Sequence, residues 1–162
     1  MPDVISNTSS LQYHFQLWML HILPDLAHHV IIPPAVADEL RVGRESGVNL
    51  PDPTVFDWLA MRRPVSAPAT RLVTDLGAGE TEVLMLAMEA ADPLVIFDDM
   101  LARRMARSLG IRLTGTLGLL LDAKRAGLIP TVSPLLDRLQ SPRFRLAPHT
   151  RAAVLQLAGE VP

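Results

Sequence analysis

Short apolar segments alternate with longer segments of helical period along this chain, and this alternation constrains its fold more than any other feature. The strand-like segments are DVIS at 3–6, HHVII at 28–32 and PLVIF at 93–97. The helical segments that follow them cover about 10–23, 34–41 and 99–109. Such alternation is typical of βαβ units, whose parallel strands form a sheet covered by helices. The sequence therefore predicts an α/β protein with a three-layer α/β/α fold and a mostly parallel central sheet.

The same patterns predict further elements in the rest of the chain. Helices are expected over about 54–61, 80–91, 116–126, 134–140 and 149–158, and strands at IRLTG, 111–115, and near FRL, 144–146. The stretches 42–53 and 63–70 carry Gly, Pro, Ser and Asn without a period, which predicts surface loops. Because 162 residues without an internal repeat can bury one sizeable core, we expect a single domain over 1–162.

Composition and charge narrow the classes of function. The formal net charge of −2 excludes a protein that coats nucleic acid by bulk charge, so any contact with nucleic acid requires a local basic patch. Although 49% of the residues are hydrophobic, no apolar run approaches the ~20 residues that span a bilayer, and no membrane contact is expected. The chain has no cysteine and no basic start followed by an apolar segment, so we expect a cytoplasmic protein.

Polar and acidic residues follow the predicted strands or begin the helices after them. These residues are Asn7, which ends the first strand, Glu39 on the next helix, Glu80 with Glu82, and Asp98 with Asp99. Since the carboxyl ends of parallel strands meet at one edge of a sheet, we expect these side chains to converge there. Carboxylates brought together repel one another, and a divalent cation relieves that repulsion. Oxygen ligands of this kind select Mg²⁺ or Mn²⁺.

Each of these residues also has a purely structural interpretation. Glu80 and Glu82 interact favourably with the dipole of their helix, and Asp99 is well placed as an N-cap. Glu39 fits a solvated helix position, and Asn7 fits a turn into Thr8. Only their coincidence at one sheet edge favours a functional site.

The order and spacing of these motifs resemble a PIN domain, the metal-dependent ribonuclease fold used by VapC-type toxins of bacterial toxin–antitoxin pairs. The resemblance rests on SNTSSL at 6–11, VADEL at 36–40, GETEVLMLAMEA at 79–90 and LVIFDD at 94–99. A little-characterised PIN-like subgroup of bacteria and archaea is closer still. Its marks are GAGE at 77–80, DD followed by ARR and LG within 98–110, and TGTLGLLLDAKRAGLIP at 114–130.

The resemblance implies a metal site and a reaction. One or two Mg²⁺ ions, or Mn²⁺, would be held by Glu39, Glu80 and Asp98, with Asp99 or Glu82 helping, and would activate water for hydrolysis of an RNA phosphodiester. The chain departs from the family at two positions. Ile96 replaces the usual threonine two places before the fourth acid. Asn7 replaces the first metal-binding aspartate. Its amide still offers one neutral oxygen to the metal, but the replacement removes a full charge from the site.

Arginines follow the acidic pair in MLARRMARSLGIR, 100–112. Arg103 and Arg107 lie at i and i+4 of the predicted helix, with Arg104 beside them. They fit RNA phosphates, a solvated helix face, or, for Arg103, a pair with a carboxylate. Thr116, at the start of the next helix, fits either a phosphate-binding turn or a simple cap.

We therefore expect an endoribonuclease toxin that is neutralised by a small antitoxin protein. The alternative is a weak or inactive PIN-like module that binds RNA or a partner protein. A receiver or phosphatase domain is disfavoured, because the only lysine, Lys124, lies inside a predicted helix. The apolar segment LQYHFQLWMLHIL, 11–23, has more apolar surface than one helical stripe buries in a monomer, which favours a homodimer.

Overall fold

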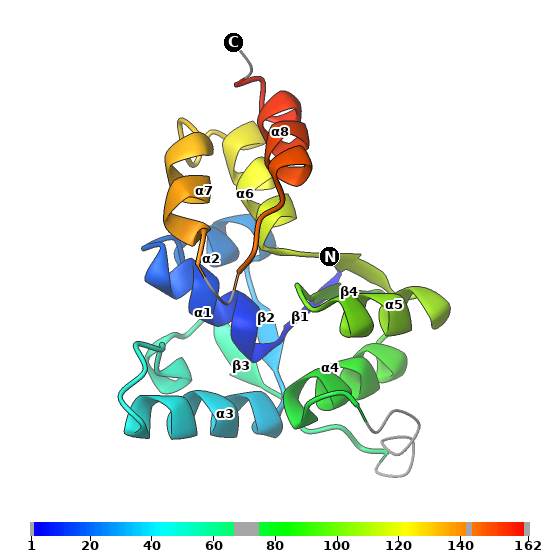
Figure 1. Ribbon diagram of the computed structural model, residues 1–162. Coiled ribbons are helices and arrows are strands. Elements are labelled where there is room, and N and C mark those ends of the chain that lie inside the picture. Colours follow the sequence, from blue (N-terminus) through cyan, green and yellow to red (C-terminus); the bar gives the residue numbers. More distant parts are fainter. Residues whose placement is uncertain (1, 67–74, 142–143, 161–162) are drawn as a thin grey trace.

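The central sheet has five strands, and all of its pairings are parallel. The computed structural model describes residues 2–66, 75–141 and 144–160. The strands are β1 (Asp3–Ser6), β2 (Val30–Ile32), β3 (Leu59–Met61), β4 (Pro93–Ile96) and β5 (Arg112–Thr114), and their order across the sheet is β3-β2-β1-β4-β5 (Figure 1). Together with the helices this gives a three-layer α/β/α architecture, which confirms the predicted fold class.

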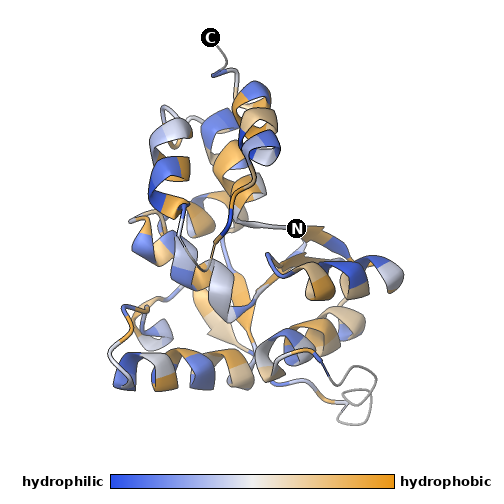
Figure 2. Ribbon diagram, viewed as in Figure 1, coloured by the Kyte–Doolittle hydropathy of each residue, from blue (hydrophilic) through white to orange (hydrophobic). Residues whose placement is uncertain are grey.

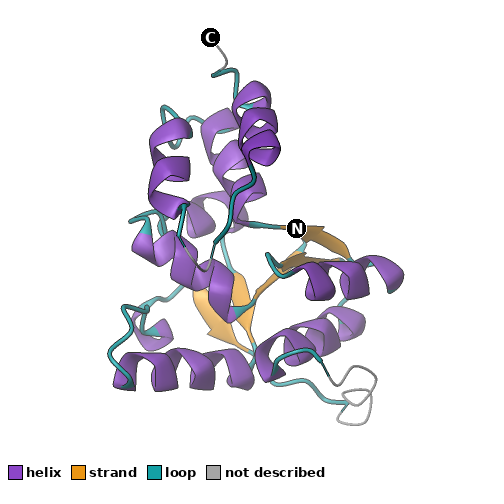
Figure 3. Cartoon of the chain, viewed as in Figure 1, coloured by secondary structure: helices purple, strands orange, loops and turns teal. Residues whose placement is uncertain are grey.

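Helices surround this sheet and extend beyond one end of it (Figure 3). They are α1 (Thr8–Gln16), α2 (Ile22–Ala27), α3 (Pro34–Glu45), α4 (Ala78–Glu89), α5 (Met100–Ser108), α6 (Thr116–Arg125), α7 (Ser133–Leu139) and α8 (Pro148–Leu157), with a short 3₁₀ helix η1 (Pro53–Val55). Helix α4 packs on β1 and β4, α5 on β5, and α2 on β2. Helices α6, α7 and α8 form a separate group above the sheet in Figure 1.

Apolar side chains form two neighbouring cores. The larger one lies around the strands, which are coloured as hydrophobic in Figure 2. Its residues Ile5, Val30 and Ile96 are fully buried. The second joins α6, α7 and α8 to the α1–α2 region, and Leu17 and Ile22 belong to it. In the part of the chain that the structure describes, no helix is long and apolar enough to cross a membrane.

The helix predicted over 10–23 is wrong in its length, because the chain turns between α1 and α2. Trp18 has a φ of 60° at this turn, and Met19 N donates to His14 O over 2.8 Å, which closes the end of α1. The turn allows both Leu17 and Ile22 to enter the second core. Most of the apolar surface that favoured a homodimer is thereby buried in one chain, while the Trp18 side chain stays 77% exposed.

The helix predicted over 54–61 is wrong as well. Pro53 and Asp52 begin the 3₁₀ turn η1, in which Asp52 Oδ1 accepts from Thr54 N over 3.0 Å, and the chain then forms the edge strand β3 beside β2. A strand of three residues is too short to show a period of two, so its sequence gave no signal of a strand.

The strand predicted near 144–146 is wrong for a different reason. This segment is irregular, and its apolar residues Phe144 and Leu146 fill the second core instead of pairing with a strand. The loop predicted over 42–53 begins later than expected, because α3 continues to Glu45. Of the loop predicted over 63–70, the part 67–70 lies outside the described residues.

Glu160 connects the C-terminal end of the chain to α6 and α7. Its carboxylate accepts from Val132 N over 2.8 Å and from Ser133 N over 3.2 Å, at the start of α7, and it pairs with Lys124 of α6 over 3.0 Å. Burial alone would raise the pKa of Glu160, but the hydrogen bonds from Val132, Lys124 and Ser133 outweigh it and lower the pKa. The carboxylate form thus stabilises the helical group.

We predict that Glu160→Gln lowers the free energy of unfolding by about 1–2 kcal/mol, because the amide group opposes backbone donors with a donor of its own. Denaturant unfolding at pH 7 measures the change. Because the pKa is lowered in the folded state, the difference should be complete at neutral pH and should shrink below about pH 4. The control is Glu45→Gln, which removes an exposed i,i+4 pair with Arg41 and should cost less than about 0.5 kcal/mol. Equal losses in both variants would contradict the role of Glu160.

Candidate active site

The strand order of the sheet reverses between β1 and β4. The predicted site lies at the carboxyl ends of these two strands. The chain runs from β1 outward to β2 and β3 on one side, and from β4 outward to β5 on the other. β1 and β4 end together, with Ser6 opposite Ile96. Asn7 follows β1 directly, and Asp98 follows β4 after one intervening residue. Ligands of open parallel sheets bind at such a switch point.

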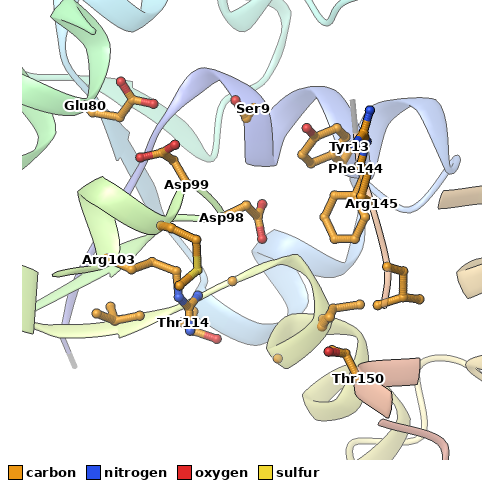
Figure 4. A pocket seen from close by; sticks show the side chains of 16 residues that line it. Ser9, Tyr13, Glu80, Asp98, Asp99, Arg103, Thr114, Phe144, Arg145 and Thr150 are labelled. Atoms are coloured by element: carbon orange, nitrogen blue, oxygen red, sulfur yellow. The ribbon is translucent and has the colours of Figure 1, made fainter. Parts of the chain in front are cut away.

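A cleft of about 760 Å³ opens at this edge of the sheet. Of the predicted site residues, it is lined by Glu80, Asp98, Asp99 and Arg103 (Figure 4). Further lining residues come from α1, from the start of α6, from the segment before α8 and from α8 itself, and include Ser9, Tyr13, Gly115, Phe144, Arg145 and Thr150. The cleft is therefore bounded by elements that are distant in the sequence.

Asp98 is held at the floor of the site by three hydrogen bonds. Oδ1 accepts from Thr116 N over 2.8 Å, and Oδ2 accepts from Thr116 Oγ1 over 2.7 Å and from Ser10 Oγ over 3.1 Å. A Cβ atom at Gly115 would lie 2.9 Å from Asp98 Oδ1, so the close approach of the chain to this carboxylate requires glycine there. Thr116 is fully buried, and its hydroxyl group is committed to Asp98.

Asp99 and Arg103 lie on the α5 side of the cleft. Asp99 caps α5, with Oδ1 accepting from Ala102 N over 2.9 Å. Arg103 donates from Nη1 to Phe97 O over 2.8 Å, and within the described chain it has no carboxylate at ion-pair distance. Burial lowers the pKa of Arg103, Arg107 adds to this effect, and Asp98 opposes it. The guanidinium group is thus fixed in place at the cleft wall.

The other two predicted arginines lie away from the cleft. Arg104 and Arg107 are exposed on α5 and are not among the residues that line it.

Glu39 joins three helices behind the cleft. Its carboxylate accepts from Thr8 Oγ1 on α1 and, over 2.9 Å, from Gly79 N on α4. A Cβ atom at Gly79 would lie 2.6 Å from Glu39 Oε2, so a larger residue there would displace the Glu39 carboxylate. Glu39 itself does not line the cleft.

Glu80 is close enough to other acidic groups for their charges to affect it. Burial raises its pKa, and the negative charges of Asp99 and Glu39 raise it further. Its Oε2 also accepts from Gly77 N over 3.0 Å, which caps the start of α4. Glu82, one of the predicted metal ligands, does not line the cleft; its Oε2 accepts from Ala35 N at the start of α3 over 2.9 Å.

Asn7 is 2% exposed, and it does not line the cleft. Its Oδ1 caps α1 by accepting from Ser10 N over 3.1 Å. Its Nδ2 is buried and has no hydrogen-bond partner among the described residues. An aspartate could make the same cap and would present a second oxygen in place of this nitrogen.

The arrangement fits a divalent ion in charge and in ligand atoms. Glu80, Asp98 and Asp99 provide only oxygen ligands to the cleft, and the negative charges of Asp99 and Glu39 add to burial in raising the pKa of Glu80. The spacing of these side chains does not yet match a metal site. Across the described residues, no three His, Asp or Glu side chains are close enough together to hold a metal ion.

Sequence reasoning missed the cleft residues outside the acidic motifs. Tyr13, Phe144, Arg145 and Thr150 line the same cleft as Asp98. Phe144 and Arg145 lie in the segment that was predicted as a strand. No local pattern links them to α1 or to the acidic residues, because they meet only through the packing of α6, α7 and α8.

His14 is a buried histidine beneath the site. Its Nδ1 lies 2.7 Å from Ser10 O, while its Nε2 is buried without a hydrogen-bond partner among the described residues. Burial lowers the pKa of His14, although the bond to Ser10 and the charge of Asp98 oppose this effect. Nδ1 therefore carries the proton and the ring is neutral.

We predict that the protein loses stability below the ordinary histidine pKa of 6.5, because the unfolded chain then binds a proton that folded His14 does not. The loss should approach about 1.4 kcal/mol per pH unit. Denaturant unfolding between pH 7.5 and 5 measures it. His14→Leu should remove this slope, whereas exposed His149→Gln should keep it. An unchanged slope in His14→Leu would assign the effect to other groups.

The charge at Glu80 leads to a second prediction. Its raised pKa means that its contribution to stability is present below the ordinary pKa of 4.5 and is lost as the pH rises through the folded-state value. Glu80→Gln keeps the cap on Gly77 N and removes the charge. We expect it to raise the free energy of unfolding at pH 7 by about 0.5 kcal/mol, a value discounted because the group is half exposed. The gain should vanish near pH 4, and a loss at pH 7 would contradict the charge repulsion.

Known proteins identify the family of this chain. Its fold is similar to a solved structure of a PilT N-terminus domain protein from the hyperthermophilic archaeon Sulfolobus solfataricus P2. The TM-score is 0.52 at 20% sequence identity, and the match covers 87% of this chain and 96% of that chain. No curated protein matches. A family model described as a PIN domain matches residues 3–160. The match covers nearly the whole sequence, and the chain therefore belongs to the PIN domain family.

Proposed function

We propose that this chain is a Mg²⁺- or Mn²⁺-dependent endoribonuclease whose active site is the cleft at the β1–β4 switch point. PIN domains are typically nucleases that bind RNA and use divalent metal ions. The observation that carries the proposal is the position of Glu80. Burial raises its pKa, and the negative charges of Asp99 and Glu39 raise it further, so carboxylates from three separate elements act on one another at the sheet edge.

In the proposed mechanism, the chain supplies a fixed carboxylate, a cationic group and a proton acceptor. Asp98 has both oxygens oriented by Thr116 and Ser10, so its position is set before a substrate binds. Arg103 is held by Phe97 O at the cleft wall, where its charge would bind an RNA phosphate. Glu80, with its raised pKa, is suited to accept a proton from attacking water. A bound divalent ion would acidify that water and stabilise the charge that develops on the phosphate.

The proposal extends to the biological role and the assembly of the protein. We propose that the enzyme is a cytoplasmic toxin paired with a small antitoxin protein, as the resemblance to VapC-type toxins implies. We also propose a homodimer. The apolar surface that supports a dimer is smaller than the sequence indicated. In the α1–α2 region Trp18 is exposed, whereas Leu17, Ile22 and Leu23 are buried.

A second candidate function is a binding module without catalysis. The observation that favours it is Asn7, whose amide nitrogen takes the place of a carboxylate oxygen and is buried without a partner. The absence, among the described residues, of three convergent acidic groups agrees with this alternative.

The variant Asn7→Asp distinguishes these two functions. We predict that wild type shows weak Mn²⁺-dependent RNA cleavage, and that Asn7→Asp raises both the rate and the affinity for Mn²⁺ by restoring a charge. Without metal, the variant should lose about 1–3 kcal/mol of stability, because it places an unpaired charge at a buried position. With Mn²⁺ its melting temperature should rise more than that of wild type.

Calorimetric titration with Mn²⁺, thermal melts and a labelled single-stranded RNA provide the measurements. The matched control is Asn49→Asp, the same chemical change at the only other asparagine, which is exposed in the segment between α3 and η1. If folded Asn7→Asp bound Mn²⁺ no better than wild type, the nuclease function would have to be abandoned in favour of the binding module.

A further inference from the structure

We infer that the end of the cleft formed by Tyr13, Phe144 and Arg145 is a subsite for an unpaired base and an adjoining phosphate of a single RNA strand. This inference rests on the proposed function for the choice of RNA. In Figure 4, Glu80 and Asp99 lie on one side of the cleft, Tyr13, Phe144 and Arg145 on the other, and Asp98 between them.

The aromatic pair gives this end a rigid apolar wall. The ring centroids of Tyr13 and Phe144 are 4.9 Å apart, and the ring planes are at 84°, which is an edge-to-face contact. Phe144 is buried in the second core, so its ring is held from behind by α6, α7 and α8. Tyr13 is half-buried on α1 and lines the cleft. Aromatic side chains placed in this way bind bases by stacking, with little dependence on sequence.

The charges at this end fit a phosphate group. Arg145 follows Phe144 directly, is exposed, and lines the cleft. It forms no ion pair with any residue that the structure describes. Arg103 is the corresponding cation on the acidic side of the cleft. A strand that crosses Asp98 thus meets a guanidinium group on each side of the acidic centre, which is the charge pattern that an RNA backbone requires.

The size and the chemistry of the cleft select a single strand. Its volume of about 760 Å³ lies in the range of pockets that enclose small ligands, so it has room for nucleotides but not for a double helix. The faces of paired bases in a duplex are covered by their neighbours, whereas an unpaired base exposes a face to an aromatic ring. Tyr13 can therefore stack only on a base that has left a helix.

Fluorescence anisotropy with a labelled 12-nucleotide oligouridine tests this subsite, in EDTA so that no cleavage occurs. We expect Tyr13→Leu to weaken binding about 5- to 100-fold and Tyr13→Phe, which keeps the ring, to bind nearly as wild type does. Arg145→Ala should lower the salt dependence of binding by about one released counterion. Trp18→Leu, which removes an exposed aromatic ring beyond the end of the same helix, should leave affinity unchanged.

A sugar-phosphate oligomer of the same length without bases is the second probe. It should bind wild type and Tyr13→Leu equally, because it lacks the group that stacks. The subsite is refuted if folded Tyr13→Leu binds oligouridine as wild type does, or if Tyr13→Phe loses as much affinity as Tyr13→Leu. Should Tyr13→Leu fail to fold, equal binding of oligouridine and of the base-free oligomer to wild type would refute the subsite.

These outcomes are independent of catalysis. Base-dependent binding without Mn²⁺-dependent cleavage would overturn the proposed nuclease and leave the subsite standing. If Tyr13→Leu left both cleavage and RNA binding unchanged, the subsite would be overturned and the proposed nuclease would stand.

Discussion

The hydrogen bonds of Asp98 hold together the parts of the molecule that form the cleft. One carboxylate at the end of β4 accepts from the first residue of α6 and from Ser10 on α1. It therefore joins the sheet, the helix that covers the switch point, and the first helix of the C-terminal group. Mutation of Asp98 cannot separate catalysis from folding. In Asp98→Asn an amide donor would face the donors of Thr116, so the variant would also lose stability. Glu80 is the better probe, since glutamine can replace it without loss of its cap.

The acidic side of the cleft illustrates a conflict between stability and function. Burial raises the pKa of Glu80, and the charges of Asp99 and Glu39 raise it further, which means that the folded chain is less stable at neutral pH than it would be without this charge. A site kept under such repulsion is typical of a place where a cation binds. Asn7 works in the opposite direction. It removes one charge at the same sheet edge while keeping the cap on α1, and its cost is a buried amide nitrogen without a partner.

The sequence predicted those parts of the fold that depend on local patterns. The segments that form β1, β2, β4 and β5 are apolar runs next to segments of helical period. This pattern predicted the parallel sheet, and the acidic residues after the strands predicted a site at its edge. The missed features depend on tertiary contacts. β3 is a short edge strand defined only by its pairing with β2, and the turn at Trp18 exists because Leu17 and Ile22 both pack into the second core. The convergence of Glu80 with Asp99 had a sequence signal, whereas the meeting of Tyr13 with Phe144 had none.

The second core therefore has a role beyond the support of three helices. Phe144 belongs to that core and at the same time forms the wall of the cleft opposite the acidic residues. Helix α6 sets the position of Phe144 relative to Asp98. The first residue of α6, Thr116, donates to Asp98, and Lys124 near the end of α6 forms an ion pair with Glu160. Phe144 lies in an irregular segment, but its burial in the second core ties the aromatic wall to packed helices. A strand bound in this cleft would be positioned for cleavage by the same contacts that make the C-terminal helices fold onto the sheet.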